Sequence, residues 1–150
     1  MKRFLLIFAL LGSPALAAES ADVAAVKAVL KVYKAALERR DAAPALNVFT
    51  ADSQVFESGG VEGTFANYLE HHIGPELGEF KEFSFRDYKV DVHVDALYAF
   101  ATETYIYKIV LKDDRVIEKR GVATSVLKKL GAEWKIIQTH SSSRNLPKKN

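Results

Sequence analysis

Two long segments near the end of the chain most constrain its fold. Val116–Lys129 and Glu133–Ser143 each have the length and residue types of a β-strand, and Leu130-Gly131-Ala132 between them is typical of a tight turn. The second segment begins with apolar and aromatic residues and ends with hydroxyl side chains, which is expected of a strand that runs from a packed core to an open mouth. Such a mouth is a candidate ligand site.

The first 17 residues have the three parts of a secretory signal peptide. Met1-Lys2-Arg3 is basic, Phe4–Leu11 is an apolar run, and Ala15-Leu16-Ala17 is a small-x-small cleavage site. The alternative is a membrane anchor, but this run reaches only about 12 Å as a helix, against ~30 Å of hydrocarbon. We therefore expect a mature chain that starts near Ala18, is periplasmic or secreted, and has no membrane association after cleavage.

Charge and cysteine content exclude several classes of function. The chain has 21 basic and 19 acidic residues, and Lys2 and Arg3 belong to the signal peptide, so the mature chain is formally neutral with 19 of each. Together with the lack of a long basic run, this argues against a nucleic-acid partner. Without any cysteine, the domain has no thiol chemistry and depends on core burial for its stability.

The segment after the signal peptide has the pattern of an amphipathic helix of about five turns. Either Ser20 or Asp22 can cap its start, and the basic pair Arg39-Arg40 suits its carbonyl end. Its apolar residues recur at steps of three and four: Val23, Val26, Val29, Leu30, Tyr33, Ala36 and Leu37.

A second, short helix and a short strand are expected next. Pro44 can open the helix, which would continue through Phe49, because proline is tolerated at the first helical position. Gln54–Glu57 is the strand candidate, and Ser58-Gly59-Gly60 closes it.

A third helix is predicted after Thr64, which can cap it. Gly74-Pro75 would end or kink this helix, and Glu76–Phe80 would be either a loop or a last helical turn. The side chains expected to point inward from this helix are Phe65, Tyr68, Leu69, His72 and Ile73.

From Phe83 onward the apolar period changes from helical spacing to two, as in a strand. Its parity shifts by one residue at Arg86-Asp87, which predicts a β-bulge. Leu97–Leu111 is a further strand, and Lys112-Asp113-Asp114 is a hairpin turn into the two strands described first. Four long strands joined by short turns form an antiparallel sheet, and the helices must cover one of its faces. We therefore predict one α+β domain over residues 18–143, followed by a polar tail over 144–150.

This order of elements resembles the NTF2-like superfamily, which includes SnoaL-like domains, ketosteroid isomerase and the association domain of calcium/calmodulin-dependent kinase II. The segments Gly121–Leu127 and Glu133–Ser142 carry the resemblance to the last strands of the kinase domain. The resemblance implies a cone, in which a curved antiparallel sheet wraps on the long first helix with two shorter helices. It also implies a pocket inside the cone and a homodimer through the outer face of the sheet.

The resemblance to the kinase domain places a pocket on the last three strands. Three arginines line that pocket in the kinase domain, and their positions here are Tyr105, Ser125 and Ser141, so an anion-binding pocket of that type is not expected. If these three residues face inward, alternation along the strands also places Glu103, Tyr107, Ala123, Leu127, Ile137 and Thr139 inward. Together with Tyr68, these side chains suit a small, partly polar organic ligand. The alternative is a plain core whose hydroxyls bond to the backbone.

The resemblance to ketosteroid isomerase points to a different pair of residues. Its Tyr-x-Ala-Ala-Leu motif matches Tyr33–Leu37, and its catalytic carboxylate falls on Glu57. This implies that Tyr33 donates a hydrogen bond to an enolate oxygen of the substrate and that Glu57 transfers a proton. The third catalytic group of that enzyme, a protonated acid, should lie near Thr124 or Ser125, where this chain has no acid. The alternative for Tyr33 is a packing residue.

Of the four histidines, only His72 is expected to enter the pocket, because His71 points about 100° away from it on the helix. His93 and His140 have the parity of the outer face. No three ligands converge at a spacing typical of a metal site, so neither a metal nor a cofactor is expected. Three functions remain open: a ligand-binding domain, an oligomeric interaction module, or an acid–base enzyme of the isomerase, cyclase or dehydratase type that uses Glu57, Tyr33 and His72.

Overall fold

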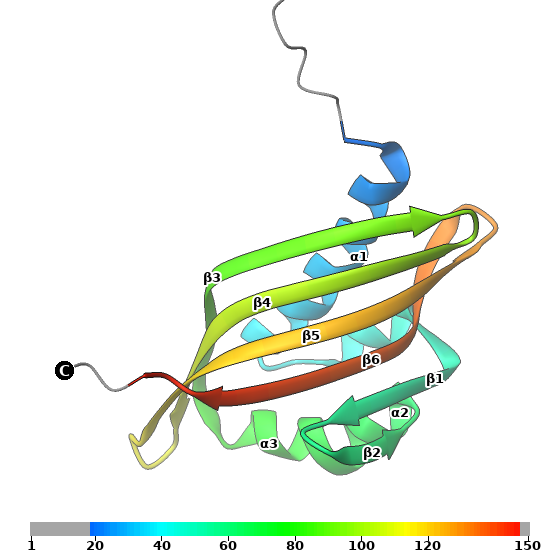
Figure 1. The fold of residues 1–150 in the computed structure, drawn as a ribbon. Coiled ribbons are helices and arrows are strands. Elements are labelled where there is room, and N and C mark those ends of the chain that lie inside the picture. Colours follow the sequence, from blue (N-terminus) through cyan, green and yellow to red (C-terminus); the bar gives the residue numbers. More distant parts are fainter. Residues whose placement is uncertain (1–18, 148–150) are drawn as a thin grey trace, which may run out of the picture.

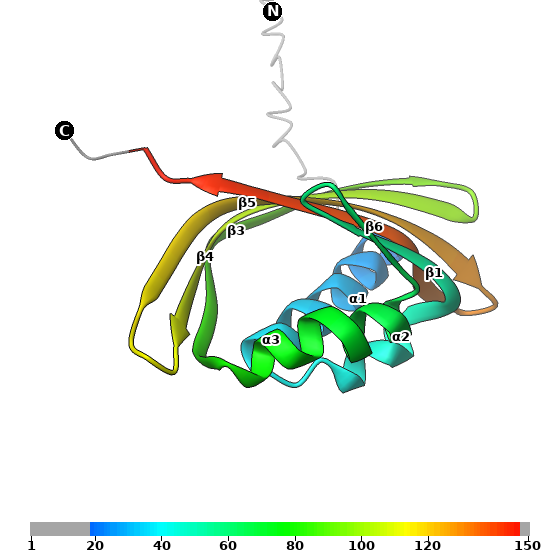
Figure 2. The same cartoon turned by 90° about the horizontal axis from the view of Figure 1, so that it is seen from below.

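The computed structural model describes residues 19–147, in which a curved six-stranded sheet arches over the helices (Figures 1 and 2). The strand order is β2-β1-β6-β5-β4-β3. The elements in chain order are α1 (Ala21–Glu38), the 3-10 helix η1 (Ala43–Val48), β1 (Phe49–Glu57), β2 (Gly60–Gly63), α2 (Phe65–Tyr68), the π-helical turn η2 (Leu69–Ile73), α3 (Gly74–Gly78), β3 (Phe80–Asp95), β4 (Tyr98–Leu111), β5 (Val116–Leu130) and β6 (Glu133–Asn145). The predicted α+β cone, with its sheet wrapped on the long first helix, is confirmed.

Helix α1 begins as its sequence predicts and is fixed to the sheet at its start. Ser20 is the N-cap, and its hydroxyl accepts a hydrogen bond of 3.2 Å from the amide of Val23. Asp22 does not cap the helix. Its carboxylate accepts hydrogen bonds from Lys129 Nζ at 2.7 Å and from Trp134 Nε1 at 3.0 Å. These contacts join the start of α1 to the β5–β6 hairpin.

The third predicted helix is a continuous helical path with a kink, made of α2, η2 and α3. Thr64 caps it, with its hydroxyl accepting a bond of 3.2 Å from the amide of Asn67. The wide π turn lies just before Gly74, where a Cβ atom would come within 2.2 Å of the carbonyl oxygen of Leu69. Gly74-Pro75 therefore kinks the helix without ending it, and Glu76 belongs to a last helical turn.

Strands β3 to β6 are antiparallel neighbours, as predicted. The expected bulge is present, because the register shifts between Arg86 and Lys89 and Asp87 has a φ of 53°. Strand β3 bends sharply there, and the bend gives the cone its curvature (Figure 1).

A second bulge, in β6, makes one prediction wrong. Leu127 pairs with Ile136 and Val126 pairs with Gln138, so Ile137 is the extra residue. Ile136 is therefore fully buried in the core, whereas Ile137, expected to face inward, is only partly buried. The shift leaves Thr139 and Ser141 on the inner face.

The edge of the sheet differs most from the prediction. Strand β1 starts at Phe49 and not at Gln54, and it pairs in parallel with β6, so the sheet is mixed. The short strand β2 was not expected from the sequence; it pairs with the end of β1. Strand β6 continues to Asn145, two residues past its predicted end at Ser143.

The core fills one end of the cone and leaves the other end open. Leu30, Leu127 and Ile136 are almost completely buried between α1 and the sheet. Phe49 and Phe65 belong to the same core, where their rings stack at 4.0 Å between centroids. No helix within residues 19–147 is long and apolar enough to span a membrane. The predicted signal peptide lies outside the described residues.

Candidate functional site

A cavity of about 290 Å³ occupies the open end of the cone. It lies between the concave face of the sheet and the helices. Figure 2 shows the arrangement of these elements, seen from below. Besides phenylalanines and small hydroxyl side chains, its wall contains the phenols Tyr33, Tyr68, Tyr88, Tyr105 and Tyr107, the carboxylates Glu57, Glu76 and Glu103, and the ammonium groups of Lys34 and Lys119.

The strand register explains why this cavity exists. Glu57 pairs with Ser141, Ser141 with Ala123, and Ala123 with Glu103, so these residues form one row across four strands. Two acids therefore flank two small residues on the inner face of a curved sheet. The small side chains of Ala123 and Ser141 leave room that a leucine or phenylalanine would fill.

Glu57 lies in the cavity wall, as the sequence predicts, and accepts a hydrogen bond from a tyrosine of the third predicted helix. The hydroxyl of Tyr68, from α2, donates to the carboxylate of Glu57. Burial raises the pKa of Tyr68, and the negative charge of Glu57 raises it further, so this phenol stays protonated and acts as a donor. Tyr68 was predicted as a ligand-binding residue and here is also the partner of the candidate base.

Tyr33 lines the cavity without contacting Glu57 through a hydrogen bond. Its ring packs edge-on against Phe49 at 5.2 Å and Phe65 at 5.6 Å. Its hydroxyl has no hydrogen-bond partner among the described residues. Burial, and then the charge of Glu57, raise the pKa of Tyr33. Tyr33 is thus a neutral phenol at the wall, with a packing role that the sequence left as an alternative.

A second pair of a phenol and a carboxylate lies across the cavity. Glu103 is 7% exposed and accepts a hydrogen bond from the hydroxyl of Tyr88. Burial raises the pKa of Glu103, and the bond from Tyr88 opposes this rise in part. Glu103 was predicted as a site residue, but Tyr88 was not. Tyr88 belongs to the apolar alternation of its strand in the sequence, but no pattern there indicates its contact with Glu103, fifteen residues away.

Tyr105 and Tyr107 line the cavity as predicted. The ring of Tyr105 lies against the backbone of Gly121, its partner on β5, where an added Cβ atom would be 2.1 Å from a ring carbon. The hydroxyl of Tyr107 lies 3.0 Å from that of Ser143 on β6. The absence of a side chain at Gly121 therefore sets the position of Tyr105.

The predicted hydroxyl residues divide into two groups. Thr139 and Ser141 line the cavity. Ser125 does not, because it is buried behind the wall, where its hydroxyl lies 3.0 Å from that of Thr139. Ser125 thus supports Thr139 and has no direct access to a ligand.

His72 lies beside the cavity wall and not in it. Its Nδ1 is 2.9 Å from Glu62, and its Nε2 is 3.4 Å from Glu76, which does line the cavity. The hydrogen bond with Glu62 raises the pKa of His72. The π turn before Gly74 changes the helical phase on which the inward prediction depended. His71, His93 and His140 are exposed, and no group of three or more potential metal ligands occurs within residues 19–147.

The fold and the internal cavity define a cone-shaped domain of the NTF2-like class. A protein of this superfamily from Salmonella enterica has a TM-score of 0.71 at 18% identity, over 83% of this chain and 91% of its own. The chain belongs to the SnoaL-like domain family, whose family model matches residues 26–145. No curated protein sequence matches the chain.

Two further solved structures are similar. A protein provisionally assigned as a ketosteroid isomerase, from Shewanella frigidimarina, has a TM-score of 0.70 and 26% identity over 79% of this chain and 94% of its own. A provisional calcium/calmodulin-dependent kinase II association domain, from Xanthomonas campestris, has a TM-score of 0.67 and 18% identity over 92% of this chain and 98% of its own. These likenesses support the superfamily inferred from the sequence.

Proposed function

We propose that this SnoaL-like domain binds a small, partly polar organic molecule in its cavity. The observation that carries the proposal is the row Glu57–Ser141–Ala123–Glu103, where two hydrogen-bonded carboxylates flank a floor of small residues. Ligand sites typically combine apolar walls with a few placed polar groups in this way, and about 290 Å³ is at the small end of their size range.

The test uses indole as a small aromatic probe and amide chemical shifts as the measurement. Addition of indole to the mature chain is expected to shift the amides of Glu57, Tyr105 and Thr139. Ala123→Leu fills the floor of the cavity and should weaken binding about tenfold or more, equivalent to about 1.4 kcal/mol. Thr124→Leu, one residue along on the exposed side of β5, is the matched control and should leave binding unchanged. Shifts confined to the outer face, or equal binding by both variants, would contradict the proposal.

A second candidate function, acid–base catalysis, is favoured by the pair of Glu57 and Tyr68. A carboxylate that accepts a bond from a protonated phenol, and that faces a cavity, has the arrangement of a general base next to a hydrogen-bond donor. Glu57→Gln should abolish turnover of a substrate while the fold is retained, and Tyr68→Phe should reduce turnover by a smaller factor. Tyr33→Phe is the control, because its hydroxyl does not contact Glu57. Full turnover by Glu57→Gln would exclude this role.

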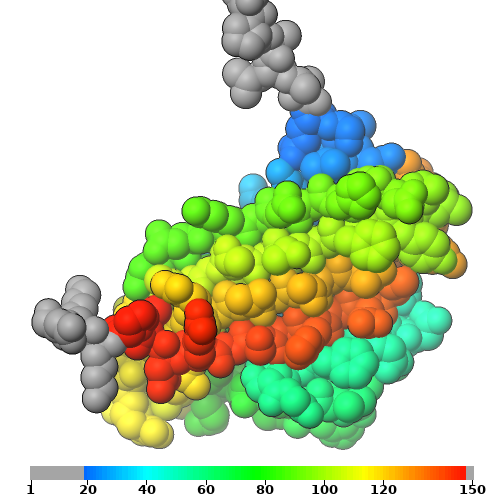
Figure 3. Space-filling view, viewed as in Figure 1, coloured from blue at the N-terminus to red at the C-terminus, as the bar shows by residue number. Residues whose placement is uncertain are grey.

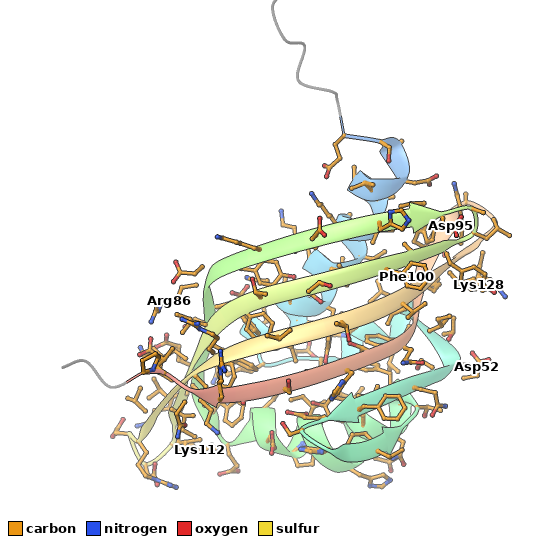
Figure 4. All side chains as sticks on the ribbon, in the orientation of Figure 1. Asp52, Arg86, Asp95, Phe100, Lys112 and Lys128 are labelled. Carbon is orange, nitrogen blue, oxygen red and sulfur yellow. The ribbon has the colours of Figure 1, made fainter. Side chains whose placement is uncertain are left out.

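We also propose that the chain forms a homodimer through the outer face of its sheet. Figure 3 shows this face of the single chain. Tyr98, Phe100 and Val122 are between 41% and 49% exposed on that face, and Figure 4 shows Phe100 pointing outward from β4. Exposed apolar groups of this kind favour a self-complementary contact. Light scattering at micromolar concentration should give twice the monomer mass, and Phe100→Glu should give a monomer. A monomeric wild type would contradict the dimer, and a large ring would favour an interaction module.

Export is proposed from the sequence of the first 17 residues alone. Intact mass of protein recovered from an exporting bacterium should show that these residues are absent. A full-length mass in the soluble fraction would contradict export.

A further inference from the structure

From the charges of the cavity wall we infer that the ligand is an organic cation with a flat, apolar body, such as a protonated aromatic amine. This inference rests on the proposed ligand-binding function and narrows the class of ligand. Glu57 and Glu103 both face the cavity, and their partners are the neutral phenols Tyr68 and Tyr88. Within the described residues, neither carboxylate lies within 4.0 Å of a lysine, arginine or histidine nitrogen.

The lysines of the wall do not compensate these two acids. Lys34 forms an ion pair with Glu38, four residues along α1 and outside the cavity. Lys119 lies near the start of β5, four residues before Ala123, where it pairs in register with Tyr107 and with Asn145, the last residue of β6. The region around Ala123 and Ser141 therefore has negative groups on both sides. Glu103 is buried and Glu57 is partly buried, so both carboxylates have lost hydration, and an approaching cation lowers their free energy whereas an anion raises it.

The aromatic part of the wall also suits a cation. Five rings contact one another in sequence on β3 and β4, with centroid distances from 4.9 to 6.4 Å: Phe83, Phe85, Tyr88, Tyr105 and Tyr107. The ammonium of Lys34 already lies 5.2 Å from the centroid of Phe85 and 5.3 Å from that of Tyr88. Aromatic faces attract cations at such distances. This wall therefore accommodates an alkylammonium group.

The acids and the aromatic rings independently favour the same class of ligand. The acids favour a positive group near the floor of the cavity, and the rings favour both that charge and a flat body. A carboxylate or phosphate ligand would face Glu57 and Glu103, and no arginine among the described residues lines the cavity to bind it.

The experiment compares three probes with the same indole body: tryptamine as the cation, tryptophol as the neutral analogue and indole-3-acetate as the anion. Titration calorimetry of the mature chain at pH 7 and low salt should show tryptamine binding about tenfold or more tighter than tryptophol, equivalent to about 1.4 kcal/mol. Indole-3-acetate should bind most weakly.

Variants assign the preference to the two acids. Glu57→Gln and Glu103→Gln should each weaken tryptamine about tenfold and leave tryptophol within about twofold. Glu118→Gln is the control, because it removes a carboxylate on the exposed side of β5, where Glu118 pairs with Arg86. Equal binding of tryptamine and tryptophol, or tighter binding of indole-3-acetate, would overturn the inference and leave ligand binding intact. Failure of all three probes to bind at millimolar concentration would overturn both.

Discussion

Replacing Tyr88 by Phe removes the hydroxyl that donates a hydrogen bond to the carboxylate of Glu103. Because Glu103 is only 7% exposed, water cannot fully replace this donor. Burial already raises the pKa of Glu103, and the bond from Tyr88 opposes that rise. The variant should therefore raise the pKa of Glu103 further.

The effect of this variant on stability depends on pH in a defined direction. A carboxyl with a higher pKa in the folded chain contributes stability below its unfolded pKa of about 4.3, and this contribution is lost as pH rises through the folded pKa. A hydrogen bond to a charged group contributes about 1.5–3 kcal/mol, against about 0.5–1.5 kcal/mol for a neutral pair. Tyr88→Phe should therefore cost about 2 kcal/mol at pH 8 and about 1 kcal/mol at pH 4.5.

Urea unfolding of a chain that spans residues 18–150, at both pH values, measures this difference. The same substitution in a Glu103→Gln background is the control, since the amide keeps the acceptor and removes the charge. In that background the loss should be about 1 kcal/mol at both pH values. If Tyr88→Phe costs the same stability at both pH values with Glu103 intact, the reasoning is refuted. It is also refuted if the cost of Tyr88→Phe still depends on pH in the Glu103→Gln background.

Three other predictions concern the wall, the histidine beside it and the core. Gly121→Ala should displace the ring of Tyr105 and cost about 1–3 kcal/mol, with altered near-ultraviolet circular dichroism; an unchanged melting temperature would show that the ring moves freely. Glu62→Gln should lower the pKa of His72 in an NMR titration, because the hydrogen bond with Glu62 is the main cause of its raised pKa. The loss of stability should be greatest below pH ~6.5 and should vanish as pH rises. An unaltered titration of His72 would contradict its interaction with Glu62. Leu30→Ala should cost about 2–5 kcal/mol in urea unfolding, and a loss below about 1 kcal/mol would show a core that collapses around the change.

The sequence predicted the fold where its signals are local. The parity shift at Arg86-Asp87 is visible because polar residues interrupt the alternation, and the structure has a bulge there. The bulge at Ile137 was hidden, since Ile136 and Ile137 are both apolar and either could face the core. The parallel pairing of β1 with β6 joins segments far apart in the chain, and no local pattern encodes it.

Several residues that the sequence indicated lie in the cavity wall, but their contacts with one another were not predicted. Glu57 was indicated by the resemblance to ketosteroid isomerase. Its hydrogen bond from Tyr68 was not predicted, because the orientation of the third helical segment depends on its packing against β1. The same dependence displaced His72, whose phase was judged from a regular helix while the chain forms a π turn. Such rotations are set by tertiary contacts and leave no periodic trace in the sequence.

The two phenol–carboxylate pairs give the cavity its distinctive electrostatics. Tyr68 joins the helical segment to Glu57 at the end of β1, and Tyr88 joins β3 to Glu103 on the neighbouring strand, just after the bulge at Asp87. Each phenol donates a hydrogen bond to a carboxylate of the cavity wall without neutralising its charge, because burial keeps the phenol protonated. An arginine in either place would cancel the charge of its acid. With tyrosines there instead, the negative charge has no cationic partner within residues 19–147, which is the basis of the proposed preference for a cationic ligand.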